Sequence, residues 1–109
     1  EFGVVFDERY LPYGSEITDE ARAYIMENQN LISSLMIIVK FAVSLGAKLK
    51  IYVYRDPEEP AQEFTVKVVW NADFEEVTRA WDELIEMVDL NDPEALSKMA
   101  IVFDSPEEE

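Results

Sequence analysis

The side chains best suited to hold a ligand lie on one face of a predicted hairpin. Residues 49–54 and 64–70 alternate apolar and polar types, which is typical of half-buried strands. If the apolar positions face a core, the opposite face carries Lys48, Lys50, Tyr52, Tyr54 and Lys67. Ammonium groups attract anions and tyrosine rings stack on bases, so this pattern predicts a ligand or partner surface. A solvated or oligomer-forming sheet face is the alternative, because lysine also discourages edge pairing.

An aromatic loop is the second candidate site. Residues 9–14 include Tyr10, Leu11 and Tyr13 where loops are usually polar, with Pro12 and Gly14 as breakers. Exposed aromatic side chains can close over a ligand or insert into a partner. The alternative is a loop that packs back over the core.

A row of carboxylates is the third candidate. The polar side of the helix predicted after Asp73 carries six acids against Arg79, namely Glu75, Glu76, Asp82, Glu83, Glu86 and Asp89. Such a row can bind a basic protein or imitate the charge of DNA, although an ordinary solvated helix face has the same pattern.

A short acidic stretch resembles a cation site in composition only. Asp89, Asn91, Asp92 and Glu94 offer the oxygen ligands that Ca²⁺ and Mg²⁺ accept. However, Pro93 occupies an expected ligand position and the glycine that such loops require is absent. A helix end followed by a turn is the better interpretation, and we predict no metal site.

The composition excludes several kinds of catalysis. The chain has no cysteine and no histidine, which removes thiolate chemistry, zinc–sulfur sites and the commonest general base. Only three glycines are present, and no nucleophile elbow, P-loop or dinucleotide-binding pattern occurs. We therefore predict no catalytic residues and no cofactor. An enzyme here would have to use carboxylates, Lys, Tyr, Ser or Thr.

The charge narrows the range of partners. Acidic residues outnumber basic ones 24 to 9, for a net charge of -15. This field repels phosphate backbones and anionic lipids, so we expect no duplex nucleic acid and no membrane as partner. It favours a basic protein, although solubility alone also explains it. The start of the chain lacks a signal-peptide pattern, and residues 31–45 are too few to span a membrane. A cytoplasmic location is the expectation.

The remaining segments predict a two-layer fold. Residues 3–6 are expected to form a first strand, residues 18–45 a first helix capped by Thr18 or Ser15, and residues 100–103 a last strand. Asp73 with Glu76 fits a capping box at the start of a second helix, and Gly46 suits the end of the first.

The resulting order of elements is strand, helix, strand, strand, helix, strand. It predicts an α+β two-layer sandwich, in which an antiparallel sheet carries two helices on one face in ferredoxin-like βαββαβ order. Residues 1–103 would form one domain, and residues 104–109 a frayed acidic tail.

The first helix is unusually long and unusually apolar. A helix over residues 18–45 would be about 42 Å long at 1.5 Å per residue, whereas the predicted strands, of roughly six or seven residues, span about 20–23 Å. It must therefore break near Asn28-Gln29-Asn30 or overshoot its sheet, and the sequence leaves both outcomes open. The apolar surface of its second half predicts a homo-oligomer, most simply a two-fold dimer. The expected interface residues are Ile37, Ile38, Phe41 and Leu45. Alternatively, the N-terminal loop and the C-terminal segment cover this surface within one chain.

Together, these features favour a non-enzymatic, self-associating interaction or regulatory module. A small-molecule-binding domain, or a minor enzyme that uses tyrosine and carboxylate groups, is one alternative. An acidic mimic of nucleic acid that binds a basic protein is the other.

Overall fold

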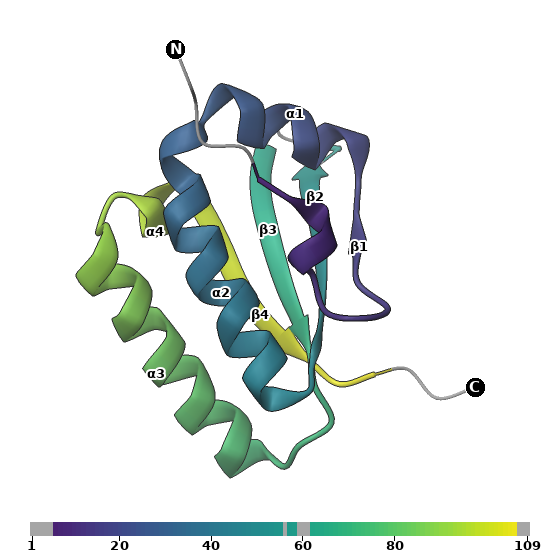
Figure 1. Cartoon of the computed structure of the whole chain (residues 1–109), viewed down its shortest axis with the longest axis vertical. Coiled ribbons are helices and arrows are strands. Elements are labelled where there is room, and N and C mark those ends of the chain that lie inside the picture. Colours follow the sequence, from purple (N-terminus) through teal and green to yellow (C-terminus); the bar gives the residue numbers. More distant parts are fainter. Residues whose placement is uncertain (1–5, 56, 59–61, 107–109) are drawn as a thin grey trace.

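Four strands form one mixed sheet, with the helices against one of its faces (Figure 1). The computed structural model describes residues 6–55, 57–58 and 62–106. The strands are β1 (Glu16–Ile17), β2 (Lys48–Arg55), β3 (Gln62–Val69) and β4 (Met99–Asp104), in the order β1-β2-β3-β4. Helices α2 (Ile32–Leu45) and α3 (Phe74–Asn91) lie side by side in front of the sheet, and α1 (Asp19–Glu27) crosses its upper end in Figure 1. The mixed α+β class is thus confirmed.

The central hairpin follows the alternation of its sequence. Strands β2 and β3 are antiparallel, with Leu49 opposite Val68 and Ile51 opposite Val66. All four of these side chains are buried beneath the helices, because alternate residues of a strand point to the same face. The predicted hairpin is therefore confirmed, whereas residues 56 and 59–61 of its expected turn lie outside the described residues.

The predicted antiparallel sheet is not what the structure has. Strand β1 is parallel to β2, and β3 is parallel to β4. After each of β1 and β3, the helices carry the chain back to the end of the sheet at which that strand started. The next strand, β2 or β4, therefore runs parallel to it. The ferredoxin-like arrangement is not confirmed, because the strands that a passage connects are direct neighbours rather than separated by another strand.

The first strand lies later in the chain than expected. Residues 3–5 of the predicted strand 3–6 lie outside the described residues, and Phe6 is outside any strand. Strand β1 instead consists of Glu16 and Ile17, which pair with Lys50 and Ile51. The main-chain N–H of Thr18 extends the pairing by donating to the Ile51 carbonyl at 3.1 Å.

The long first helix is broken, which decides the question that the sequence left open. Helix α1 ends before Asn28, a 3-10 turn η2 (Gln29–Leu31) follows, and the axis bends by 98° before α2. The Asn28 side-chain amide donates to the Tyr24 carbonyl at 2.9 Å. Asparagine favours this kind of helix end because its side chain competes for main-chain groups. The helix therefore does not overshoot the sheet.

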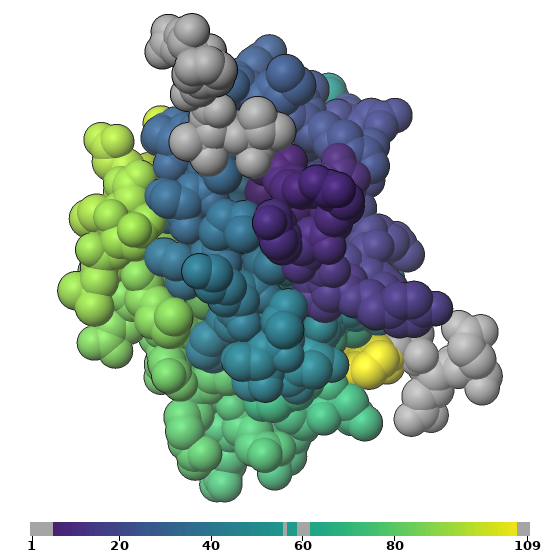
Figure 2. All heavy atoms as spheres, in the orientation of Figure 1, coloured from purple at the N-terminus to yellow at the C-terminus, as the bar shows by residue number. Residues whose placement is uncertain are grey.

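The apolar surface of α2 is largely covered within the single chain. Leu35 and Ala42 are fully buried, and α2 contacts both the sheet, through β2, and α3. On another flank of α2 lies the segment of residues 6–11, which contains the short 3-10 helix η1 (Glu8–Tyr10). Figure 2 shows this segment, in dark purple, seated against the blue helices. This arrangement matches part of the single-chain alternative, in which the N-terminal loop covers the helix.

Side-chain caps set the helix ends as their sequence signals predict. Thr18 accepts a hydrogen bond from the Ala21 main-chain N–H at 3.1 Å. Asp73 and Glu76 form a complete capping box at the start of α3. Gly46 ends α2 in the left-handed conformation, with φ 73°. The short helix α4 (Ala95–Lys98) then leads into β4.

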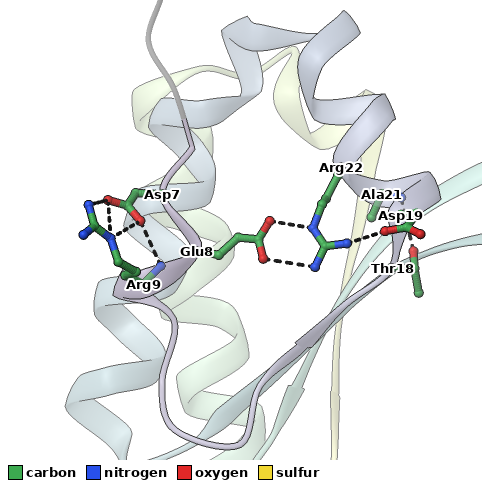
Figure 3. Close-up of polar contacts among 7 residues, drawn as sticks. All are labelled: Asp7, Glu8, Arg9, Thr18, Asp19, Ala21 and Arg22. Carbon is green, nitrogen blue, oxygen red and sulfur yellow. Dashed lines mark hydrogen bonds and ion pairs between the residues drawn. The ribbon is translucent and has the colours of Figure 1, made fainter.

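Charged contacts attach the N-terminal segment to α1 (Figure 3). Glu8 accepts from Arg22 through two hydrogen bonds of 2.5 and 3.1 Å, and Arg22 also pairs with Asp19. Asp7 accepts from the main-chain N–H and the guanidinium of Arg9, both at 2.9 Å. The Arg9 hydrogen bonds lower the pKa of Asp7, and the Glu8 carboxylate raises the pKa of Arg22.

Candidate functional site

The strand register gathers the predicted ligand-binding residues on the sheet face that the helices leave uncovered. Lys50 is directly opposite Lys67 across β2 and β3, and Tyr52 is opposite Thr65. Lys48 and Tyr54 lie on the same face, at alternate positions of β2. We call the surface formed by Lys48, Lys50, Tyr52, Tyr54 and Lys67 the lysine–tyrosine face. Tyr54 is exposed and the other four side chains are half-buried.

The lysines of this face surround a polar hollow of about 160 Å³. It is lined by Lys48, Lys50, Lys67, Val69, Asp104, Ser105 and Pro106. Asp104 is the last residue of β4, opposite Val69, and does not belong to the frayed tail to which the sequence assigned it. The sequence carries no periodic signal for this position, because residues 100–103 form a continuous apolar run that stops before Asp104.

One lysine of the hollow is partnered within the chain. The Lys67 ammonium lies 3.5 Å from the Asp104 carboxylate and 5.8 Å from the centre of the Tyr52 ring. The ring face adds a cation–π attraction to this ion pair. Within residues 6–55, 57–58 and 62–106, neither Lys48 nor Lys50 forms an ion pair. The hollow therefore carries more positive than negative charge, in a chain whose net charge is -15.

The aromatic loop does not join this face. Tyr10 and Tyr13 are exposed, at 62% and 102% of their surface, while Leu11 packs against the core. Tyr10 borders a shallow, largely apolar hollow of about 620 Å³ with Met36 and Val43 on α2. Part of the loop thus packs on the protein, as the alternative interpretation expects, and its two tyrosines remain accessible.

A second apolar hollow, of about 180 Å³, lies where the N-terminal segment meets α1 and α2. Ile25, Met26 and Ile32 line it, and the paired Glu8 and Arg22 also border it. Because the carboxylate and guanidinium are already paired with each other, this hollow offers apolar contact and little directed chemistry.

The predicted interface residues on α2 differ in their accessibility. Ile38 is fully buried in the core of the single chain, so it has no surface left for a partner. Ile37, Phe41 and Leu45 are half-buried and pack against that core. The sequence pattern predicts one wide apolar surface. It does not indicate which part of that surface packs against the sheet, against α3 or against residues 6–11.

The six predicted acids of α3 are all exposed. At the end of that helix, the Asn91 amide donates to the hydroxyls of Ser33 and Ser34 at 3.1 Å each. Asp92 accepts from the Glu94 main-chain N–H at 3.2 Å. These contacts agree with a helix end and turn. In the part of the chain that the structure describes, no cluster of acidic side chains is arranged to hold a metal ion.

Two further findings concern the whole chain. Among the described residues, no single helix has the length and apolar character needed to cross a bilayer. Only α1 and the η2–α2 segment together reach both, and these two lie at 98° to each other. Comparisons of the chain with models of protein families, with curated proteins and with solved structures found no match.

Proposed function

We propose that this chain is a non-enzymatic interaction module whose contact surface is the lysine–tyrosine face. One observation carries the proposal: in the described part of the chain the helices lie against one face of the sheet, and the opposite face carries the lysines and tyrosines. The backbone of paired strands is already fixed, so a partner that binds here has to order side chains but no loop. Tyrosine is enriched where proteins meet, since it combines a large rigid ring with a polar tip.

Site-specific photo-crosslinking tests this proposal even though the partner is unidentified. A photoreactive phenylalanine derivative replaces Tyr54 on the sheet face in one variant and Tyr13 on the loop in the other, within the native cells. Tyr13 is the matched control because it has the same side chain and is more exposed, at 102% against 52%. We expect an adduct of defined mass, reproduced with the purified partner, from position 54 only.

The other outcomes assign the contact elsewhere. An adduct from position 13 alone would transfer the function to the aromatic loop. A third variant at Met87, on α3, tests the alternative in which the acidic helix binds a basic protein. An adduct from that position alone, lost at high salt, would replace our proposal by that alternative.

Self-association through α2 is a second candidate, supported by the apolar residues left accessible there. Val43 is 55% exposed, and it lies with Tyr10 and Met36 around the shallow hollow described above. A second copy that buried these side chains would remove apolar surface from water. Light scattering over a wide concentration range tests this candidate, and a constant mass near 12.6 kDa would reject it.

A further inference from the structure

The lysines of the sheet face are placed where their charges repel. Lys50 and Lys67 are direct cross-strand partners, and Lys48 lies on the same face two positions along β2. The Cβ atoms of direct partners are about 5 Å apart, and like charges in such a pair are destabilising. An anion bound between these ammonium groups would remove that cost.

The described residues supply only part of the compensating charge. Asp104 pairs with Lys67 at 3.5 Å. Glu16 lies opposite Lys50 across β1 and β2, yet among the ion pairs of the described residues none joins these two side chains. Among the residues that the structure describes, three ammonium groups thus share one paired carboxylate around the hollow.

The stems of these lysines are held by their surroundings. All three side chains are half-buried, and a Cβ atom added at Gly14 would lie 3.5 Å from Cδ of Lys48, in ordinary contact. Lys67 is held between Asp104 and the Tyr52 ring. The Lys67 ammonium is therefore positioned at the hollow before any ligand arrives, which reduces the entropy lost on binding there.

We infer that this hollow binds side-chain carboxylates of an acidic segment in a partner protein. The inference rests on the proposed function and names the chemistry of the partner. A hollow of about 160 Å³ has the volume of roughly five water molecules at about 30 Å³ each. It accepts one or two carboxylate groups, and the neighbouring residues of the segment would contact the rings of Tyr52 and Tyr54 along β2.

The net charge decides between an acidic peptide and a nucleic acid. At physiological salt, charges farther apart than about 8 Å are largely screened. A short peptide meets mainly the lysines at the hollow, whereas a long polyanion with one charge per phosphate also meets the negative remainder of the surface. The local surplus is small, so it matches one or two carboxylates better than a phosphate backbone.

Amide NMR titration of the whole protein tests the inference with defined peptides. The probe is a short peptide of alternating glutamate and serine with one central phenylalanine. Its companion carries glutamine in place of every glutamate. We expect only the glutamate peptide to shift the amide signals of Lys50, Lys67 and Asp104. In the triple variant Lys48→Gln, Lys50→Gln and Lys67→Gln, its affinity should fall about tenfold, given the usual strength of partly exposed ion pairs.

A charge-matched variant separates local contact from the general field. Lys40→Gln, Arg79→Gln and Lys98→Gln together remove the same number of positive charges, one each from α2, α3 and α4. This control should bind within about twofold of the parent, because the removed charges are distant and screened. An equal loss in both variants would overturn the inference and leave only a general charge effect. Circular dichroism must show that both variants keep their folds.

Asp104 supplies a variant with the opposite sign. It competes with the incoming carboxylate for Lys67, so Asp104→Asn should raise the affinity by about threefold. A loss of affinity would overturn the proposed role of Lys67.

The peptide pair distinguishes failure of this inference from failure of the proposed function. If both peptides bind this face equally and independently of the lysines, the carboxylate site is wrong and the interaction face stands. If a peptide with phosphoserine binds and the glutamate peptide does not, the ligand is a phosphate group and the inference is wrong. Absence of any shift with either peptide would also overturn it, while the crosslinking experiment would still test the face.

Discussion

Truncation of two adjacent isoleucines tests how α2 is packed. Ile38 is fully buried, and Ile37 is half-buried on the neighbouring side of the same helix. Alanine at a buried isoleucine removes both its contacts and the filled volume, which costs about 2–5 kcal/mol. At Ile37 the side chain already contacts water, so the same change should cost about 1 kcal/mol. Helix propensity changes equally at both positions and therefore cancels in the comparison.

Urea unfolding measures this difference directly. Trp81 is half-buried beside Phe103, with ring centres 5.5 Å apart, so its fluorescence should report unfolding. With a slope of about 2 kcal/mol per molar urea, Ile38→Ala should lower the midpoint by about 1–2.5 M and Ile37→Ala by about 0.5 M. A domain of this size has a free energy of unfolding of about 5–15 kcal/mol, so both variants should still fold.

Equal costs for the two variants, or a larger cost for Ile37→Ala, would refute the single-chain packing of α2. If Ile37→Ala costs as much as Ile38→Ala, and the midpoint of the parent rises with protein concentration, a second copy must cover Ile37. If neither variant loses stability, the burial of Ile38 itself would be wrong.

Other contacts of the chain give four shorter predictions. Asn91→Ala should cost about 1–2 kcal/mol by leaving the buried Ser34 hydroxyl without its donor, and a cost near zero in urea unfolding would contradict this. Gly46→Ala should cost about 1 kcal/mol through backbone strain alone, because φ is +73° and an added Cβ meets nothing within 4 Å; a neutral result would refute the left-handed cap. The pKa of Asp7 is lowered by Arg9, so its contribution to stability is present above the ordinary carboxyl pKa and is lost as the pH falls through the lowered value. Arg9→Gln should return that pKa toward its ordinary value in an NMR titration, and an unchanged value would exclude Arg9 as the cause. Duplex DNA should give no gel shift at micromolar protein and physiological salt, because the net charge is -15, and a shift abolished by the triple lysine variant would reverse that prediction.

Local signals predicted the elements that local chemistry determines. The alternation of residues 49–54 and 64–70 identified the hairpin, and Asp73 with Glu76 identified the start of α3. Each of these signals depends on residues within a few positions of one another. They can therefore be recognised in the sequence without knowledge of the tertiary structure.

The arrangement of the sheet could not be predicted in the same way. Strand β1 has two residues, too few to show any alternation. The pairing of β3 with β4 joins segments separated by a whole helical passage, and their sequences do not state which neighbour each edge takes. The residues around Asn28 indicated either a broken helix or one that overshoots the sheet. The break occurs, and it lets α1 pack across the end of the sheet.

The candidate site was predictable on the hairpin and not at its border. Alternation placed Lys50, Tyr52 and Lys67 on one face, because period two applies along any paired strand. Asp104 was missed because the last strand is one residue longer at its end than its apolar run suggests. The Lys67–Asp104 ion pair, which partly neutralises the hollow, therefore depends on the pairing of β4 with β3.

The ion pairs of the N-terminal segment give ionic strength a particular effect on this molecule. Residues 6–11 cover one flank of α2 and are attached to α1 through the exposed Glu8–Arg22 pair. Any salt weakens exposed ion pairs, whereas kosmotropic salts such as sulfate also strengthen the burial of apolar groups, so sulfate acts on this segment in two opposing directions. Amide hydrogen exchange near Tyr10 should consequently be fast and salt-dependent, while exchange in β3 should be slow and depend on global unfolding. We therefore expect the edge of the core beside Val43 to open separately from the rest of the fold, to an extent that depends on ionic strength.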